Sequence, residues 1–152
     1  MTHIDLDTTT VHRVGDSYSQ EMGYFGNIWV RSHRLENSGD QNGGGHLHPF
    51  DHVTMLHKGR ILAETTNPET GEMRSKEFTA PTFIVIRKNL KHKFTALEDD
   101  TQYYCVFALR DVDGDVTDIY SGDNDPYRIV PDDYWTKKKL EDLEKSTTHE
   151  DE

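Results

Sequence analysis

The sequence predicts an all-β domain, a closed barrel or sandwich of short strands, followed by one short C-terminal helix. Two observations support this fold class. From Gly26 onward, segments rich in aromatic and β-branched residues recur at intervals of about ten residues. Turn-forming residues separate these segments, as in the run from Asn67 to Gly71. Many short strands with turn chemistry between them are typical of barrels and sandwiches.

The elements follow in order along the chain. Residues 1–25 have no clear period, and we expect an extended N-terminal arm with some pairing. The expected strands then cover residues 27–32, 51–56, 60–65, 73–78, 83–86, 92–97 and 102–109. A glycine-rich loop, 36–45, separates the first two strands, and Asp113-Gly114 has the residue types of a hairpin turn.

The C-terminal part of the sequence predicts a helix over residues 133–145, capped by Asp132 or Asp133. The polar and acidic residues 146–152 are expected to be disordered. We therefore divide the chain into an arm (1–25), a barrel (26–131), and a helix with an acidic tail (132–152). Its length fits one domain with a single core.

The composition disfavours several classes of function. Seventeen Lys and Arg residues against 28 Asp and Glu residues give a formal net charge of −11, which opposes binding to nucleic acid. The sequence has no apolar run of about 18 residues, and its first residues lack the regions of a signal peptide. We expect a cytoplasmic protein that binds neither nucleic acid nor membrane. The single cysteine, Cys105, excludes an intrachain disulfide.

Histidines are concentrated in one short segment. The chain has nine, and four of them lie between positions 46 and 57. Because successive residues of a strand point to opposite faces, His46, His48 and His52 should share one face, and His57 should face away. Three imidazoles inside a small barrel are costly to bury alone, and a shared divalent cation would satisfy them. The alternative is that His46 and His48 are exposed loop residues beside a proline.

Two segments of the chain resemble the two motifs of the cupin family. The first cupin motif has two histidines one residue apart, then a glutamate, then a glycine. This chain has the same spacing, with a histidine in place of the glutamate, at His46, His48, His52 and Gly59. The leading glycine of that motif is here Asp40. The resemblance covers about residues 26–110.

The second cupin motif has a proline, a glycine two residues later, and a histidine three residues beyond. This chain has Arg87, Asn89 and His92 at those places. Asn89 is a tolerable substitute for glycine, because asparagine adopts a positive φ more readily than most residues. Together the two motifs imply a small β-barrel with one divalent metal at its centre.

The resemblance implies that the metal ligands are His46, His48, His52 and His92. Four-histidine cupins hold Mn, Fe, Ni, Cu or Zn, and several resemble dioxygenases. The preferred function is therefore metal-dependent oxidation of a small organic molecule. A non-redox isomerase, decarboxylase or lyase that uses the metal as a Lewis acid is one alternative, and a non-catalytic binding module is another. Cupins often dimerise, so we expect a homodimer to which residues 1–25 contribute.

Two tyrosines on the expected strand 102–109 are candidates for a catalytic role. A hydroxyl of Tyr103 or Tyr104 aimed at the metal would serve as an acid or base. The alternative is that these tyrosines and Cys105 pack in the core or at an interface. The acidic residues from Asp111 to Asp118 lack the glycine and glutamate spacing of a calcium loop.

Overall fold

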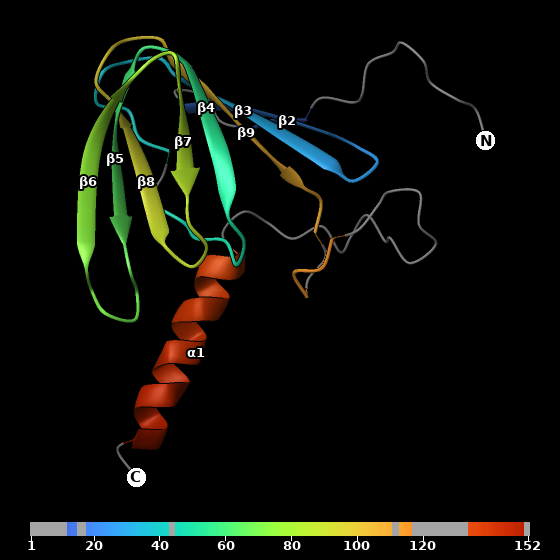
Figure 1. The fold of residues 1–152 in the computed structure, drawn as a ribbon, viewed down its shortest axis with the longest axis vertical. Coiled ribbons are helices and arrows are strands. Elements are labelled where there is room, and N and C mark those ends of the chain that lie inside the picture. Colours follow the sequence, from blue (N-terminus) through green and yellow to red (C-terminus); the bar gives the residue numbers. More distant parts are fainter. Residues whose placement is uncertain (1–11, 15–17, 43–44, 111–112, 117–133, 151–152) are drawn as a thin grey trace, which may run out of the picture.

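The computed structural model describes residues 12–14, 18–42, 45–110, 113–116 and 134–150, which form two antiparallel sheets and one helix (Figure 1). The larger sheet has the strand order β1-β2-β3-β9-β4-β7, and the smaller has the order β6-β5-β8. The strands are β1 (His12–Val14), β2 (Tyr18–Phe25), β3 (Ile28–Leu35), β4 (His52–Lys58), β5 (Arg60–Thr66), β6 (Met73–Thr79), β7 (Thr82–Ile86), β8 (Lys91–Ala96) and β9 (Thr101–Ala108). The helix α1 (Tyr134–Glu150) follows the strands, so the all-β class with one C-terminal helix is confirmed.

The core lies between the inner faces of the two sheets. Alternate residues of β3, β4 and β8 are buried; in β4, His52, Thr54 and Leu56 face inward and Val53 and Met55 face outward. The buried apolar cluster draws on both sheets and contains Leu35, Leu56, Ile61, Ala63, Ile84, Ile86, Phe94, Ala96, Tyr103 and Cys105. The two sheets therefore hold one shared core, which fixes the inward direction of each strand.

Two segments differ from the sequence-based expectation. Residues 18–25, expected in the arm, form β2, which pairs with β3 along its whole length. The hairpin turns at Gly26, whose φ of +59° suits glycine. Residues 146–150, expected to be disordered, continue α1, because no glycine or proline follows Lys145 to end the helix. The expected caps Asp132 and Asp133 lie outside the described residues. Among the residues that the structure describes, no helix is long and apolar enough to cross a membrane.

The carboxylate of Asp100 binds side chains from three strands at the end of the barrel where β9 begins. Asp100 accepts hydrogen bonds from Arg34 Nε (2.9 Å), Gln102 Nε2 (2.9 Å) and Lys58 Nζ. The hydrogen bonds from Lys58 and Gln102, helped by the charge of Arg34, lower the pKa of Asp100 from 3.8 to about 2. The ionised form is therefore favoured by the folded state.

Replacing Asp100 by asparagine should remove a pH-dependent part of the stability. A lowered pKa in the folded state contributes stability above the ordinary value of 3.8, and this contribution is lost as the pH falls toward 2. Asparagine also tolerates the φ of +57° at this position, so Asp100→Asn isolates the charge. Urea unfolding should show a lower stability for the variant at about pH 7 and a smaller difference from the parent at about pH 3. If the variant and the parent differed in stability by the same amount at both pH values, the lowered pKa of Asp100 would be contradicted.

Candidate metal centre

A loop beside β8 positions the first histidine. Residues 39–42 and His46 pair antiparallel with β8, and His46 and His92 exchange two backbone hydrogen bonds, of 3.1 and 2.9 Å. The buried Asn42 fixes the loop further, because its Oδ1 accepts a hydrogen bond from the backbone N–H of Phe94 (2.9 Å). Gly45 has a φ of +96°, and a Cβ there would lie 3.2 Å from the carbonyl oxygen of His92. The glycine thus permits the close approach that sets His46 opposite His92.

Backbone hydrogen bonds at Leu47 and His48 fix the position of the chain around His48. Leu47 is buried, and its backbone N–H donates to Thr136 Oγ1 of α1 (2.8 Å). The carbonyl of His48 accepts a hydrogen bond from the backbone N–H of Asn89 (2.8 Å). Asn89 has a φ of +62°, the conformation expected of it at the glycine place of the second motif. Contacts on both sides therefore fix the chain around His48.

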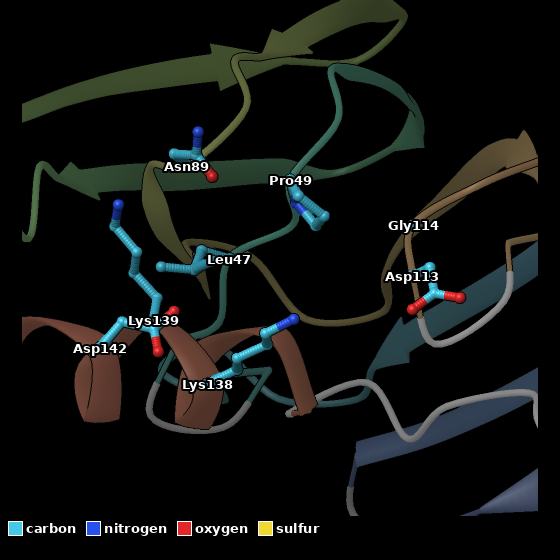
Figure 2. A pocket seen from close by; sticks show the side chains of 8 residues that line it. All are labelled: Leu47, Pro49, Asn89, Asp113, Gly114, Lys138, Lys139 and Asp142. Atoms are coloured by element: carbon cyan, nitrogen blue, oxygen red, sulfur yellow. The ribbon is translucent and has the colours of Figure 1, made fainter.

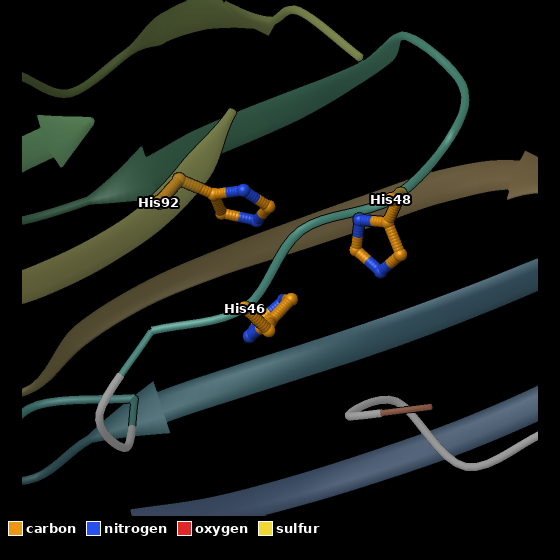
Figure 3. Close-up of side chains that lie close together, drawn as sticks. All are labelled: His46, His48 and His92. Carbon is orange, nitrogen blue, oxygen red and sulfur yellow. The ribbon is translucent and has the colours of Figure 1, made fainter. Parts of the chain in front are cut away.

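Three imidazoles meet in the barrel interior. Figure 3 shows His46 and His48, from the loop, and His92, from β8, grouped around a common space. One ring nitrogen from each lies within 4.8 Å of the other two. His48 and His92 are buried, at 6% and 2% exposure, while His46 is half-buried. Three imidazole nitrogens converging at this spacing suit a divalent transition ion, for which imidazole is a good ligand.

The fourth predicted ligand lies beside this group. His52 is buried at the start of β4. Its ring centroid lies 5.1 Å from that of His48 and 5.2 Å from that of His92. The structure thus brings all four predicted histidines together, with the nitrogens of His46, His48 and His92 forming the compact group.

The surroundings of His92 favour its metal-binding form. Burial, and then the neighbouring His46, His52 and His48, lower the pKa of His92 well below its usual range, so the ring is neutral at neutral pH. Its Nδ1 lies 3.3 Å from the carbonyl oxygen of Leu90. A proton on Nδ1 would donate to that carbonyl and leave Nε2 as a free lone pair. A neutral imidazole of this kind is the species that binds metals.

Aromatic side chains line the same interior. Phe50 stacks on His48 with centroids 5.1 Å apart, and Phe107 lies 6.0 Å from His48 and 6.3 Å from His52. Trp29 stacks on Phe107 at 5.5 Å. Their apolar surfaces limit the access of water to the histidines, which strengthens electrostatic interactions there.

The sequence-based reasoning missed one buried cation on β3. Arg31 is only 4% exposed; its guanidinium lies 5.3 Å from the Trp29 ring and 3.2 Å from Met22 Sδ. Its inward position on β3, two residues from Trp29 and two from the buried His33, is the signal that would have found it.

The two tyrosines have different surroundings. Tyr103 is buried in the core, where it stacks on His33 (4.5 Å) and meets the edge of Phe94 (5.2 Å). Tyr104 lies on the outer face of β9 and stacks on His57 (4.8 Å), so it points away from the four histidines. His57 is exposed, as its position in the strand alternation predicts.

A pocket of about 300 Å³ lies between the histidine loop and α1 (Figure 2). Leu47, Pro49 and Asn89 line it on the barrel side, and Lys138, Lys139 and Asp142 line it on the helix side. Leu47 and Pro49 flank His48 in the sequence, so the pocket borders the histidine loop. The four histidines themselves are not among its lining residues.

Comparison with known proteins shows the fold. No protein-family model and no curated protein matches the sequence. Among solved structures, the chain is similar to the oxalate decarboxylase of Lactobacillus farciminis in complex with formate, with 13% identity and a TM-score of 0.57 over 70% of this chain and 34% of that one. The chain is also similar to the Bacillus subtilis oxalate decarboxylase, with 15% identity and a TM-score of 0.57 over 70% of this chain and 30% of that one.

A third similar structure is CapF with the inhibitor 3-isopropenyl-tropolone, with 12% identity and a TM-score of 0.54 over 65% of this chain and 30% of that chain. The chain matches only about a third of the length of each of these proteins. At these identities the similarity concerns the fold alone, and all three are cupins. The described part of the chain therefore has the cupin fold that its two motifs predict.

Proposed function

We propose that this chain is a metal-dependent cupin enzyme that oxidises a small organic molecule. The convergence of His46, His48 and His92 within 4.8 Å, inside an aromatic-lined barrel, is the observation that carries the proposal. His52 would complete a set of four ligands. When bound, a divalent metal held by neutral imidazoles would keep its full charge and polarise the oxygen atoms of an organic molecule beside it.

The chain's own residues would orient the ligands and exclude water. The Leu90 carbonyl would hold the His92 ring in one tautomer, and the bond from Leu47 to Thr136 would hold the loop that carries His46 and His48. Phe50 and Phe107 would exclude water.

A non-redox reaction is the second candidate. It is kept as a candidate because two of the similar structures, which share the fold of this chain, are oxalate decarboxylases. In that case the metal would act only as a Lewis acid on a carboxylate or carbonyl.

Metal identification combined with oxygen measurement separates the two candidates. The full chain, purified without added metal, would be analysed for bound Mn, Fe, Ni, Cu and Zn, then loaded with each ion in turn. Oxygen uptake would be followed with a panel of small carboxylic and phenolic compounds, and carbon dioxide release would be followed with oxalate. Oxygen uptake that requires Fe, Mn or Cu supports oxidation. Turnover with zinc and no oxygen uptake favours the Lewis acid, and binding of an ion without either reaction would contradict both.

The variant His52→Ala tests whether the site has three or four ligands. If His52 is a ligand, its loss should weaken metal binding by at least about tenfold, as in His46→Ala. Isothermal titration with one ion, applied to both variants and the parent, measures this. Parent-like affinity in His52→Ala, together with a clear loss in His46→Ala, would reduce the set to three histidines.

A further inference from the structure

The helix α1 contacts the segment that carries two of the proposed ligands. Leu47 stands between His46 and His48. Its backbone N–H donates to Thr136 Oγ1 (2.8 Å), and both residues are buried. Leu47 lines the pocket between the loop and α1 (Figure 2), while the rings of His46 and His48 point into the barrel interior (Figure 3). The segment 46–48 therefore has the proposed metal centre on one side and α1 on the other.

One face of α1 is turned toward the barrel. Thr136 is buried, and Lys139 and Leu143 are half-buried at spacings of three and four residues, which places them on the same side of the helix. Lys139 also forms an ion pair with Glu69, which lies between β5 and β6. The other side chains of residues 137–146 are exposed. Beyond this face, α1 points away from the barrel (Figure 1).

The contacts of this face hold α1 weakly. A neutral hydrogen bond adds only modest net stability, and an exposed ion pair often adds little. The side chain of Glu69 is 56% exposed, so its pair with Lys139 is of the weak kind. An element with little buried apolar surface can detach while the rest of a domain stays folded. The docked and detached positions of α1 thus differ by a free energy that ligand binding can change.

The packing beside the hydrogen bond agrees with a helix that can detach. Rigid parts of a folded protein are close-packed. Here a pocket of about 300 Å³ separates Leu47 and Pro49 from Lys138 and Lys139. The hydrogen bond of Leu47 to Thr136 is therefore the firm point of an otherwise open contact.

We propose that docking of α1 controls how tightly the segment 46–48 holds a metal ion, with Thr136 as a positioning residue. This inference rests on the proposed metal centre. Docked α1 fixes the backbone at Leu47, and with it the places of His46 and His48. A metal that joins these two rings to a third histidine would fix the same segment from its other side. Because both events order one short segment, each favours the other, and the coupling is reciprocal.

Titration of the full chain with zinc tests the role of Thr136. Valine keeps the shape of threonine but removes the hydroxyl, which leaves the buried N–H of Leu47 without this acceptor. Thr136→Val should weaken zinc binding by about tenfold or more, as does the loss of a residue that orients a ligand. Thr136→Ser keeps the hydroxyl and should bind zinc like the parent. Isothermal titration measures both affinities, and far-UV circular dichroism shows that the variants are folded.

Lys139→Gln tests the second contact, with Lys138→Gln as the matched control. Both variants lose one positive charge, but the ion pair with Glu69 is made by Lys139. Lys139→Gln should weaken zinc binding by up to about fivefold, whereas Lys138→Gln should not weaken it. Removing a cation would by itself favour the binding of another cation, so general electrostatics cannot explain a loss.

Amide hydrogen exchange of the full chain, followed by mass spectrometry, gives a readout that needs no activity. In the parent, saturation with zinc should slow exchange in residues 134–142 by at least about fivefold, and this protection should be smaller in Thr136→Val. A parent that binds no zinc would contradict the proposed metal centre together with this inference. Parent-like zinc affinity in Thr136→Val, or exchange in α1 that zinc does not change, would overturn this inference and leave the proposed centre intact.

Discussion

Replacing His92 by alanine is expected to lower the affinity for a divalent transition metal by at least about 100-fold. The loss of a residue that only orients a ligand already costs about 10- to 100-fold, and His92 is placed to be a ligand. Its ring centroid lies 4.5 Å from that of His46 and 5.5 Å from that of His48. Isothermal titration of the metal-free protein with zinc, and separately with nickel, measures the effect.

His57→Ala is the control for this prediction. His57 belongs to the same histidine-rich segment but stacks on Tyr104 on the outer face, so its removal should leave the affinity unchanged. Because His92 is buried and its loss opens a cavity, the half-buried His46 gives a second test in His46→Ala. Equal losses in the His57 and His46 variants would show that the metal binds outside the barrel interior.

Gly59→Ala is expected to destabilise the fold by about 2–5 kcal/mol. Gly59 has a φ of +86°, and a Cβ there would lie 2.4 Å from Thr101 Oγ1 and 2.9 Å from Thr101 Cα. Thr101 is fully buried, and its hydroxyl donates to the carbonyl of Glu98, so it has little freedom to move. Backbone strain of about 1–2 kcal/mol adds to an overpacking cost of about 1–3 kcal/mol.

Gly71→Ala is a matched control for the close contact. Gly71 also has a positive φ, +76°, but a Cβ there would meet nothing within 4 Å. Its substitution should cost only the backbone strain, about 1–2 kcal/mol. Urea unfolding of both variants separates the backbone strain from the overpacking cost. Equal losses of unfolding free energy in the two variants would show that the contact with Thr101 is unimportant. This contact also gives a physical reason for the glycine of the first motif.

The inward and outward alternation of the strands was predictable from the sequence. It places His52 inside and His57 outside, as the structure has them. The same alternation allows only one of Tyr103 and Tyr104 to face inward, and the structure puts Tyr103 there. A period of two residues fixes these directions without knowledge of the partner strands.

Other features depend on contacts between distant segments. The strand β2 was missed because Gln20 occupies an inward position and Gly23 interrupts the pattern of β-forming residues. His46 and His48 lie in a loop, not on a strand, and the pairing of that loop with β8 sets the direction of His46. The hydrogen bond from Leu47 to Thr136 joins residues 89 positions apart, so no local sequence pattern predicts it.

We propose that imidazoles from the loop and from β8 hold one metal ion in the barrel interior. Anomalous diffraction from a crystal of the metal-loaded protein, collected at the absorption edge of the ion, tests it most directly. One strong peak is expected about 2.0–2.2 Å from a ring nitrogen of each of His46, His48 and His92. A peak elsewhere on the chain, with nothing between these three rings, would contradict it.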